Sequence, residues 1–219
     1  LEEAERLARV LAQARADRGS LDFDLPEPEY IFDDAGRIQN IRRKERHFGH
    51  RLIEEFMIAV NEAVARFLEQ KRLPFLYRAH PEPEAARLEG LFRTLASTSL
   101  APALPARPRA RDLRAVLREA HGGPQEFLIG RLALRTMPQA RYQPENEGHF
   151  GLASACYCHF TSPIRRYADV IAHRALKRAL GLDSGPIPTE HKLRMIADQL
   201  NRRERAAMDA EREMARRVG

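Results

Sequence analysis

Hydrophobic residues recur along most of this chain at the three- and four-residue spacing of amphipathic helices. The spacing predicts helices over residues 1–18, 46–72, 81–95, 110–120, 124–133, 163–181 and 189–217. Apolar and charged residues alternate over 21–25, which predicts a short strand. An Asp-Asp-Ala-Gly turn between 30–32 and 38–42 predicts a β-hairpin, and 73–77 predicts one more strand.

The apolar faces of the first two helices can be assigned residue by residue. Helix 1–18 is predicted to bury Leu1, Ala4, Leu7, Ala8 and Leu11, and helix 46–72 to bury Leu52, Phe56, Ala59, Val60, Ala63, Val64 and Phe67. Residues 97–108 hold three prolines among alanine and serine, which predicts an internal proline-rich loop. The whole pattern predicts a helix-rich α+β fold with short antiparallel strands.

The most informative stretch is the start of the helix predicted at 163–181. Residues 159–174 read HFTSPIRRYADVIAHR. Thr161 or Ser162 can cap this helix, and Pro163 suits its first position because proline lacks a backbone N–H. The face predicted to point inward consists of Ile164, Tyr167, Ala168, Ile171 and Ala175.

Arg165 and Arg166 give this helix start its chemistry. The free N–H groups of a helix N-terminus attract anions, and guanidinium groups form paired hydrogen bonds with phosphate oxygens. The combination predicts a phosphate-binding site, in which Asp169, one turn further on, can orient either guanidinium. The alternative is an ordinary capped helix with a solvated arginine pair.

The composition adds modest constraints. Lys and Arg exceed Asp and Glu by 37 to 31, and this excess mildly favours a polyanionic partner such as nucleic acid. The chain is 43% hydrophobic, which is enough for a core. It has no apolar run of about 18 residues that could span a membrane. Cys156 and Cys158 would face opposite ways in an extended segment, so they are interpreted as reduced residues of a cytoplasmic protein.

Residues 159–174 resemble the signature of the RNase II/RNase R (RNB) family of exoribonucleases. Residues 140–152, ARYQPENEGHFGL, resemble the adjoining segment of that family. The resemblance implies processive 3′→5′ hydrolysis of single-stranded RNA to nucleoside 5′-monophosphates, assisted by Mg²⁺. It also implies that residues 1–219 form the C-terminal portion of one RNB catalytic domain, without the cold-shock and S1 domains common in relatives. The remainder of that domain is therefore an expected partner.

The resemblance also implies roles for particular residues. Arg165 is the expected catalytic residue, which would clamp the scissile phosphate with support from Arg166 and Tyr167, and Ser162 is expected to bind the RNA as well. Phe23 would stack on the last bases of the RNA, although an alternating strand makes core packing its default role. Glu211 would lie near the active site, with a charge-laced surface helix as the structural alternative.

The resemblance also implies that two further segments bind RNA. Glu55, in preference to Glu54, is expected to approach the RNA, while the structural alternative is a pair of solvated helix carboxylates. Tyr77, Arg78 and His80 combine stacking, charge and a titratable group on one segment. The alternative for that segment is an ordinary strand end with an exposed arginine.

No metal site is predicted within the chain. The resemblance implies that Mg²⁺ is held mainly by an aspartate cluster upstream of the segments that match. Asp33 and Asp34 imitate the end of such a cluster, but they lie in the predicted hairpin turn before Gly36 and lack further acidic neighbours. The alternatives to an exoribonuclease are a non-catalytic single-stranded RNA-binding module and a helical scaffold without an RNA role.

Overall fold

The computed structural model describes residues 1–21, 28–43, 47–98, 105, 107–183 and 185–218, so Phe23 lies outside the described residues, as do most of strand 21–25 and of loop 97–108. The helices are α1 (Glu2–Arg18), α2 (Phe48–Gln70), α3 (Ala85–Leu95), α4 (Ala110–Ala120), α5 (Glu126–Thr136), α6 (Tyr167–Ala179) and α7 (Glu190–Val218). The strands are β1 (Pro28–Phe32), β2 (Ile38–Arg43), β3 (Tyr77–Ala79) and β4 (Arg141–Gln143), and a 3₁₀ helix spans Phe150–Leu152. No described helix has both the length and the apolar character needed to cross a membrane.

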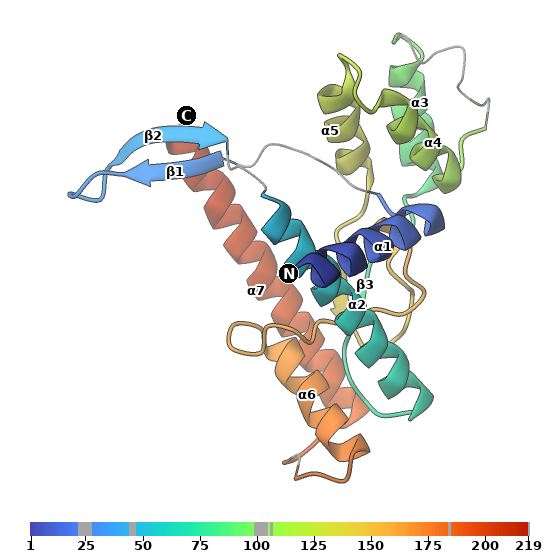
Figure 1. Ribbon diagram of the computed structural model, residues 1–219, viewed down its shortest axis with the longest axis vertical. Coiled ribbons are helices and arrows are strands. Elements are labelled where there is room, and N and C mark those ends of the chain that lie inside the picture. Colours follow the sequence, from blue (N-terminus) through green and yellow to red (C-terminus); the bar gives the residue numbers. More distant parts are fainter. Residues whose placement is uncertain (22–27, 44–46, 99–104, 106, 184, 219) are drawn as a thin grey trace.

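The described strands form two small antiparallel sheets, as the predicted fold class requires. β1 and β2 form the predicted hairpin, which projects from the body of the molecule (Figure 1). Its turn is closed by Asp33, whose Oδ1 accepts hydrogen bonds from the backbone N–H of Ala35 at 3.0 Å and of Arg37 at 2.8 Å. β3 pairs with β4, which places Tyr77 opposite Gln143.

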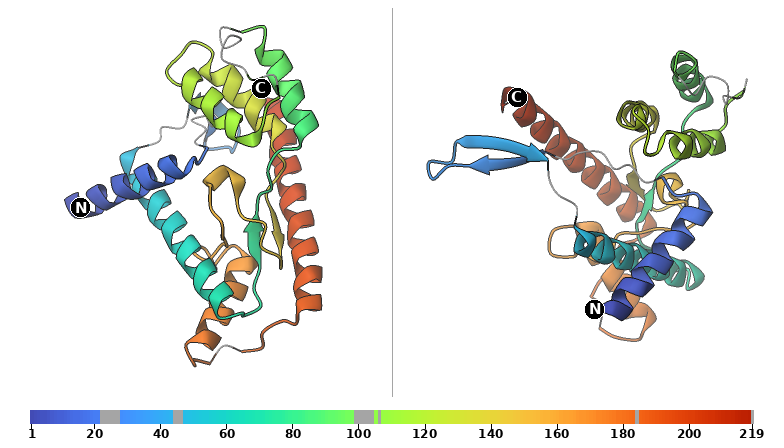
Figure 2. Two further views of the ribbon diagram at one scale, coloured as in Figure 1. Left: turned by 90° about the vertical axis from the view of Figure 1, so that its right-hand side faces the viewer. Right: turned by 45° about the horizontal axis from the view of Figure 1, so that its top comes forward.

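The hydrophobic core has two parts. The larger cluster joins α2, β3, β4, α6 and α7, and its most buried members include Leu68, Leu76, Cys158, Ile171 and Leu193. The second cluster joins α3, α4 and α5, which form a group to one side of α7 (Figure 2). Leu21 and Phe150 belong to this second cluster although they come from distant segments. The segment that contains β4 and the 3₁₀ helix therefore lies between the two parts.

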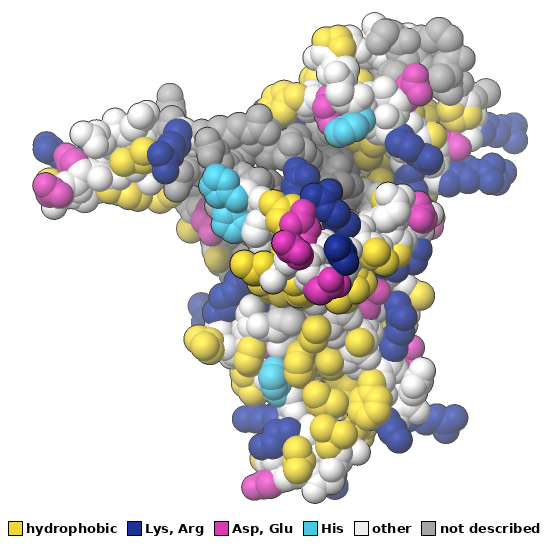
Figure 3. Space-filling view, viewed as in Figure 1, with side chains coloured by type: hydrophobic (Ala, Val, Ile, Leu, Met, Phe, Trp, Pro, Cys, Tyr) yellow, Lys and Arg dark blue, Asp and Glu magenta, His cyan; other side chains and the backbone are white. Residues whose placement is uncertain are grey.

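The buried face of α2 differs from the predicted one. Its buried residues are Glu55, Ile58, Asn61, Glu62, Val64, Ala65 and Leu68. Val60 is 42% exposed, and Leu7 of α1 is 51% exposed although it was expected inside. Figure 3 shows hydrophobic side chains gathered on the outer surface where α2 and α6 lie. The apolar spacing misplaced this face because two carboxylates and an amide take buried positions there.

Ion pairs between α1 and α2 explain how those carboxylates are buried. Arg15 contacts Glu55 through Nη2–Oε1 at 2.6 Å and Nε–Oε2 at 3.3 Å. Arg18 and Arg66 share Glu62, each at 3.0 Å. A buried charge costs little only when it is paired and hydrogen-bonded. These pairs therefore fix α1 across α2, the arrangement seen in Figure 2.

Candidate functional site

The segment before α6 forms a turn in place of the predicted helix start. α6 begins at Tyr167 with Arg166 at the cap position, and no side chain caps it. The backbone N–H groups of Arg165 and Arg166 donate to the carbonyl oxygen of Ser162 at 3.3 and 3.1 Å. The predicted cap at Thr161 or Ser162 is therefore wrong. Residues 163–165 form an outward turn that precedes the helix.

The inward face predicted for this helix is correct only from residue 168 onward. Ala168, Ile171 and Ala175 are fully buried, as expected. Ile164, in the turn, is fully exposed, and Tyr167, at the first position of α6, is 45% exposed. Ile164 is not helical, and Tyr167 is the first residue of α6, so helical spacing extended back through the turn placed these two side chains wrongly.

A buried carboxylate anchors the turn. Asp169 has no exposed surface, and its Oδ1 accepts hydrogen bonds from the backbone N–H of Ser162 at 2.8 Å and from Nη2 of Arg166 at 2.7 Å. Of the two guanidiniums that Asp169 was expected to orient, the structure selects Arg166. Oδ2 of Asp169, Nε of Arg166 and Oγ1 of Thr161 are buried without a hydrogen-bond partner among the described residues.

Arg165 differs from Arg166 in being available. Its side chain is exposed, and among the residues that the structure describes its guanidinium has no ion-pair or hydrogen-bond partner. Because Asp169 fixes the base of the turn, Arg165 projects from a defined position. An unpaired guanidinium held in this way is suited to contact an incoming phosphate.

Arg78 on β3 is engaged, contrary to its alternative as an exposed strand end. Its Nη1 and Nη2 contact the carboxylate of Glu204 on α7 at 2.7 and 2.8 Å, and its guanidinium lies 4.7 Å from the ring centroid of Tyr142. Tyr77 faces the other side of β3, is buried, and donates its hydroxyl hydrogen to Glu69 at 3.2 Å. Burial raises the pKa of Tyr77, so its hydroxyl stays protonated.

His80 begins a continuous row of ring contacts. Its Nδ1 accepts a hydrogen bond from Gly151 N–H at 3.1 Å, so Nε2 carries the hydrogen that it shares with the Pro138 carbonyl at 2.9 Å. The ring row consists of His80, His149, Tyr157, His159 and Tyr142, whose successive centroids lie 4.9, 5.3, 5.9 and 5.6 Å apart. His149, Tyr157 and His159 were not predicted as site residues, although each lies in or beside a segment with the quoted resemblance.

The sequence comparison decides the family. The model of the RNB domain matches residues 1–181. The chain belongs to the RNB family. It is 43% identical over 210 residues to ribonuclease R of Aquifex aeolicus, covering 95% of this chain and 30% of that protein. It is 40% identical over 185 residues to ribonuclease R of Escherichia coli, covering 84% of this chain and 23% of that protein. The chain thus spans less than a third of the length of these relatives.

Solved structures agree with this assignment to the RNB family. The apo form of Mycoplasma genitalium RNase R has a TM-score of 0.87 at 28% identity, covering 97% of this chain and 34% of that one. Its complex with ribose-methylated single-stranded RNA has a TM-score of 0.86, with the same coverage. Yeast Ssd1, described as a pseudonuclease, has a TM-score of 0.59 at 26% identity, covering 72% of this chain and 20% of that one.

The charges of three arginines of this RNB chain act on the end of the ring row. Burial lowers the pKa of His159 to about 2, with further contributions from the charges of Arg166, Arg78 and Arg165. The Tyr142 hydroxyl lies 2.8 Å from Nδ1 of His159. The turn before α6 and the β3 segment, which the sequence could only treat as separate candidates, therefore meet at His159 and Tyr142.

We expect acid to destabilise this RNB chain through its buried histidines. Burial lowers the pKa of His149 to about 3 and that of His159 to about 2, whereas unfolded histidine titrates near pH 6.5. Below about pH 6.5 the unfolded state binds more protons, so the free energy of unfolding falls by up to about 1.4 kcal/mol per pH unit for each histidine. Urea denaturation between pH 7.5 and 5 measures this slope.

Matched variants identify the source of that pH dependence. His149→Gln and His159→Gln should each flatten the slope between pH 6.5 and 5, whatever their effect on stability at pH 7.5. His191→Gln, at an exposed position on α7, should leave the slope unchanged. A slope that is the same in all four proteins would contradict the assignment.

The other predicted residues lie on separate elements. Glu55 is 7% exposed and bound to Arg15, whereas Glu54 is exposed on the same helix. Glu211 is exposed on α7. Their roles near RNA stay predictions, as does that of Phe23.

Among the described residues, no group of three or more His, Cys, Asp or Glu side chains could hold a metal ion. The hydrogen bond from the Arg37 backbone lowers the pKa of Asp33, whose carboxylate closes the hairpin turn. Cys156 and Cys158 are free and buried, and burial raises the pKa of both thiols, that of Cys156 to about 12. Both cysteines are therefore neutral packing residues. The described part of the chain thus offers no set of ligands that fits a magnesium site.

Proposed function

We propose that this chain forms part of the catalytic domain of a 3′→5′ exoribonuclease that hydrolyses single-stranded RNA to nucleoside 5′-monophosphates. The observation that carries the proposal is the exposed Arg165 guanidinium, which has no partner among the described residues and stands on a turn anchored by Asp169. The likeness to an RNase R solved with single-stranded RNA supports it. The reduced, buried cysteines favour the cytoplasm as its location.

The proposed reaction gives Arg165 a defined task. A water oxygen forms a bond to the phosphorus that joins the last two nucleotides, and the bond from phosphorus to the 3′ oxygen breaks. That oxygen leaves with a proton, and the last nucleotide departs with its 5′-phosphate. In the transition state negative charge is spread over the phosphoryl oxygens, and hydrogen bonds from Arg165 stabilise this charge. Arg166 supports the position of Arg165 through Asp169.

Mg²⁺ belongs to the proposal only as a cofactor of the larger domain. The described residues offer no group of ligands for it, so no step of this chain is routed through the ion. The relatives are more than three times as long as the matched stretch. We propose that the ligands lie in that additional part of the catalytic domain, which is also the expected protein partner.

A second candidate function is a non-catalytic RNA-binding module. The likeness to yeast Ssd1, a pseudonuclease, favours it, because this fold is present in a protein without the nuclease activity. The two candidates predict the same use of Arg165 in binding phosphate and differ in whether the phosphodiester is cut.

RNA shortening separates the two candidates. A polypeptide that joins this chain to the rest of its catalytic domain is incubated with Mg²⁺ and a single-stranded RNA labelled at its 5′ end. We expect a ladder that shortens from the 3′ end, together with nucleoside 5′-monophosphates in the supernatant. A folded polypeptide that binds the RNA at low salt and leaves its length unchanged would contradict the exoribonuclease and support the binding module.

A further inference from the structure

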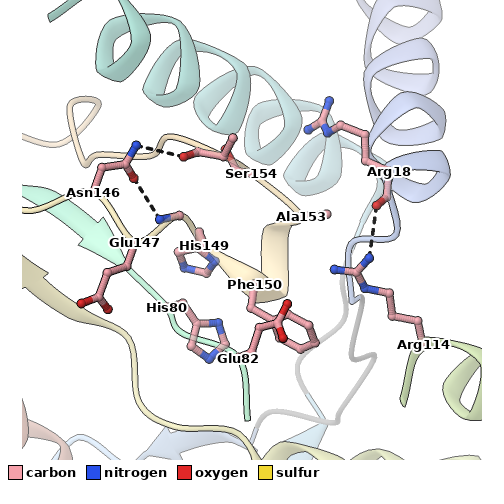
Figure 4. A pocket seen from close by; sticks show the side chains of 12 residues that line it. Arg18, His80, Glu82, Arg114, Asn146, Glu147, His149, Phe150, Ala153 and Ser154 are labelled. Atoms are coloured by element: carbon pink, nitrogen blue, oxygen red, sulfur yellow. Dashed lines mark hydrogen bonds between the residues drawn. The ribbon is translucent and has the colours of Figure 1, made fainter. Parts of the chain in front are cut away.

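A pocket of about 570 Å³ lies between the end of α1, α4 and the segment 146–155 (Figure 4). Its lining includes Arg18, Arg114, His80, His149 and Phe150. Arg165 does not line it, so it is distinct from the turn to which the catalytic step was assigned. A cavity of this volume is within the usual range for small-molecule sites.

Arg114 enters this pocket with unused hydrogen-bond donors. Its Nε is buried without a partner among the described residues, and Nη1 makes one long contact of 3.4 Å with the carbonyl oxygen of Arg18. The guanidinium lies 5.1 Å from the ring centroid of Phe150. No carboxylate in the described part of the chain pairs with it. A partly buried arginine in this state lacks the acceptor that normally offsets its burial.

The backbone is arranged around the Arg114 side chain. Gly19 has a φ of 88°, and a Cβ there would lie 2.7 Å from Nη1 of Arg114. A larger residue at position 19 would displace the guanidinium. The glycine that ends α1 therefore also makes room for Arg114 at the pocket wall.

The remaining charges leave Arg114 as the dominant cation of the pocket. Arg18 is paired with Glu62, and the lining carboxylate Glu147 is paired with Arg141, each at 3.0 Å. Glu82 also lines the pocket and is exposed to solvent. Burial lowers the pKa of His80 and His149, so both imidazoles are neutral at pH 7.

We propose that this pocket binds a nucleotide phosphate, with Arg114 as its anchor and Arg18 beside it. The inference rests on the proposed function, because an exoribonuclease of this kind meets phosphate both in RNA and in the nucleoside 5′-monophosphates that it releases. Arginine forks bind phosphate oxygens through two hydrogen bonds. Among the described residues, the long contact of Nη1 with the Arg18 carbonyl is the one hydrogen bond of the Arg114 guanidinium. Either source presents the same chemistry to the pocket.

Binding measurements on the 219-residue chain test this. Calorimetric titrations with AMP, and separately with a single-stranded RNA hexamer lacking terminal phosphates, are compared for the parent, Arg114→Met and Arg118→Met. Methionine keeps an unbranched apolar stem over Phe150, and Arg118 lies one turn further along α4 at an exposed position. We expect Arg114→Met to weaken binding of at least one ligand about tenfold, and Arg118→Met less than about twofold.

The outcomes are distinguishable. The ligand with the larger Arg114 dependence identifies the source of the phosphate. If neither ligand binds the parent, or if both variants weaken binding equally, the proposal is wrong. Arg114→Lys serves if Arg114→Met does not fold: it keeps the charge and loses the fork, so unchanged binding contradicts the proposal and weakened binding supports it. RNA shortening with no Arg114-dependent binding overturns this inference alone, whereas Arg114-dependent binding without shortening overturns the exoribonuclease alone.

Discussion

Replacing Arg165 with alanine is expected to lower the turnover number of the complete catalytic domain at least about a hundredfold, while the Kd for single-stranded RNA changes less than about threefold. The guanidinium is exposed and has no partner among the described residues, so its removal breaks no contact that the fold needs. The loss therefore falls on the transition state, where charge on the transferred phosphoryl group is greatest.

Single-turnover cleavage and filter binding measure the two effects separately. Arg165→Lys keeps the positive charge and loses the paired donors, so its turnover should lie between those of the parent and the alanine variant. Arg178→Ala, which removes an exposed arginine from the last turn of α6, is the matched control and should keep full turnover. If Arg165→Ala cuts RNA as fast as Arg178→Ala does, Arg165 has no part in the chemistry.

Apolar spacing predicted where the helices lie because most of the energy that stabilises them comes from burying one face. α4, α5 and α7 begin and end within a few residues of their predicted bounds. The hairpin was predicted from a local turn, and Asp33 closes it by contacts that span four residues or fewer. Features that depend on neighbouring residues alone can therefore be predicted from the local sequence.

Features that depend on partners far away in the sequence could not be predicted in this way. The polar buried face of α2 needs Arg15 and Arg18 of α1 to neutralise its carboxylates. Arg78 pairs with Glu204, which is 126 residues away, so no local pattern distinguishes this arginine from a solvated one. The start of α6 was misplaced because a serine-proline pair fits an N-cap. In the structure Asp169 instead accepts a hydrogen bond from the backbone N–H of Ser162, which holds this segment as a turn.

In the candidate site, too, local residues could be predicted and long-range contacts could not. The segments that carry it were found by their resemblance to the RNB family, and Arg165 and Arg166 were named from the residues themselves. Their unequal states, one exposed and one held in a buried ion pair, follow from the position of a single carboxylate. The ring row was missed because His80 and Tyr142, at its two ends, come from separate segments and meet His149 and His159 only in the folded chain.

Asp169→Ala is expected to lower the free energy of unfolding of the 219-residue chain by about 3–5 kcal/mol. The substitution leaves the Arg166 guanidinium, whose side chain is 17% exposed, without its carboxylate, and removes the acceptor for the Ser162 N–H. Urea denaturation at pH 7.5 measures the loss. Asp198→Ala, at an exposed position on α7, is the control and should stay within about 0.5 kcal/mol of the parent.

A double-mutant cycle tells the ion pair apart from mere loss of packing. In Asp169→Leu combined with Arg166→Met both charges disappear, so the double variant should lose less stability than the sum of the two single variants. Simple additivity would mean that the pair does not hold the turn.

Because Arg165 stands on that turn, Asp169→Asn, which preserves shape and removes the charge, should lower turnover in the complete domain more than it lowers RNA affinity. Equal losses would assign Asp169 to folding alone and leave the position of Arg165 independent of it.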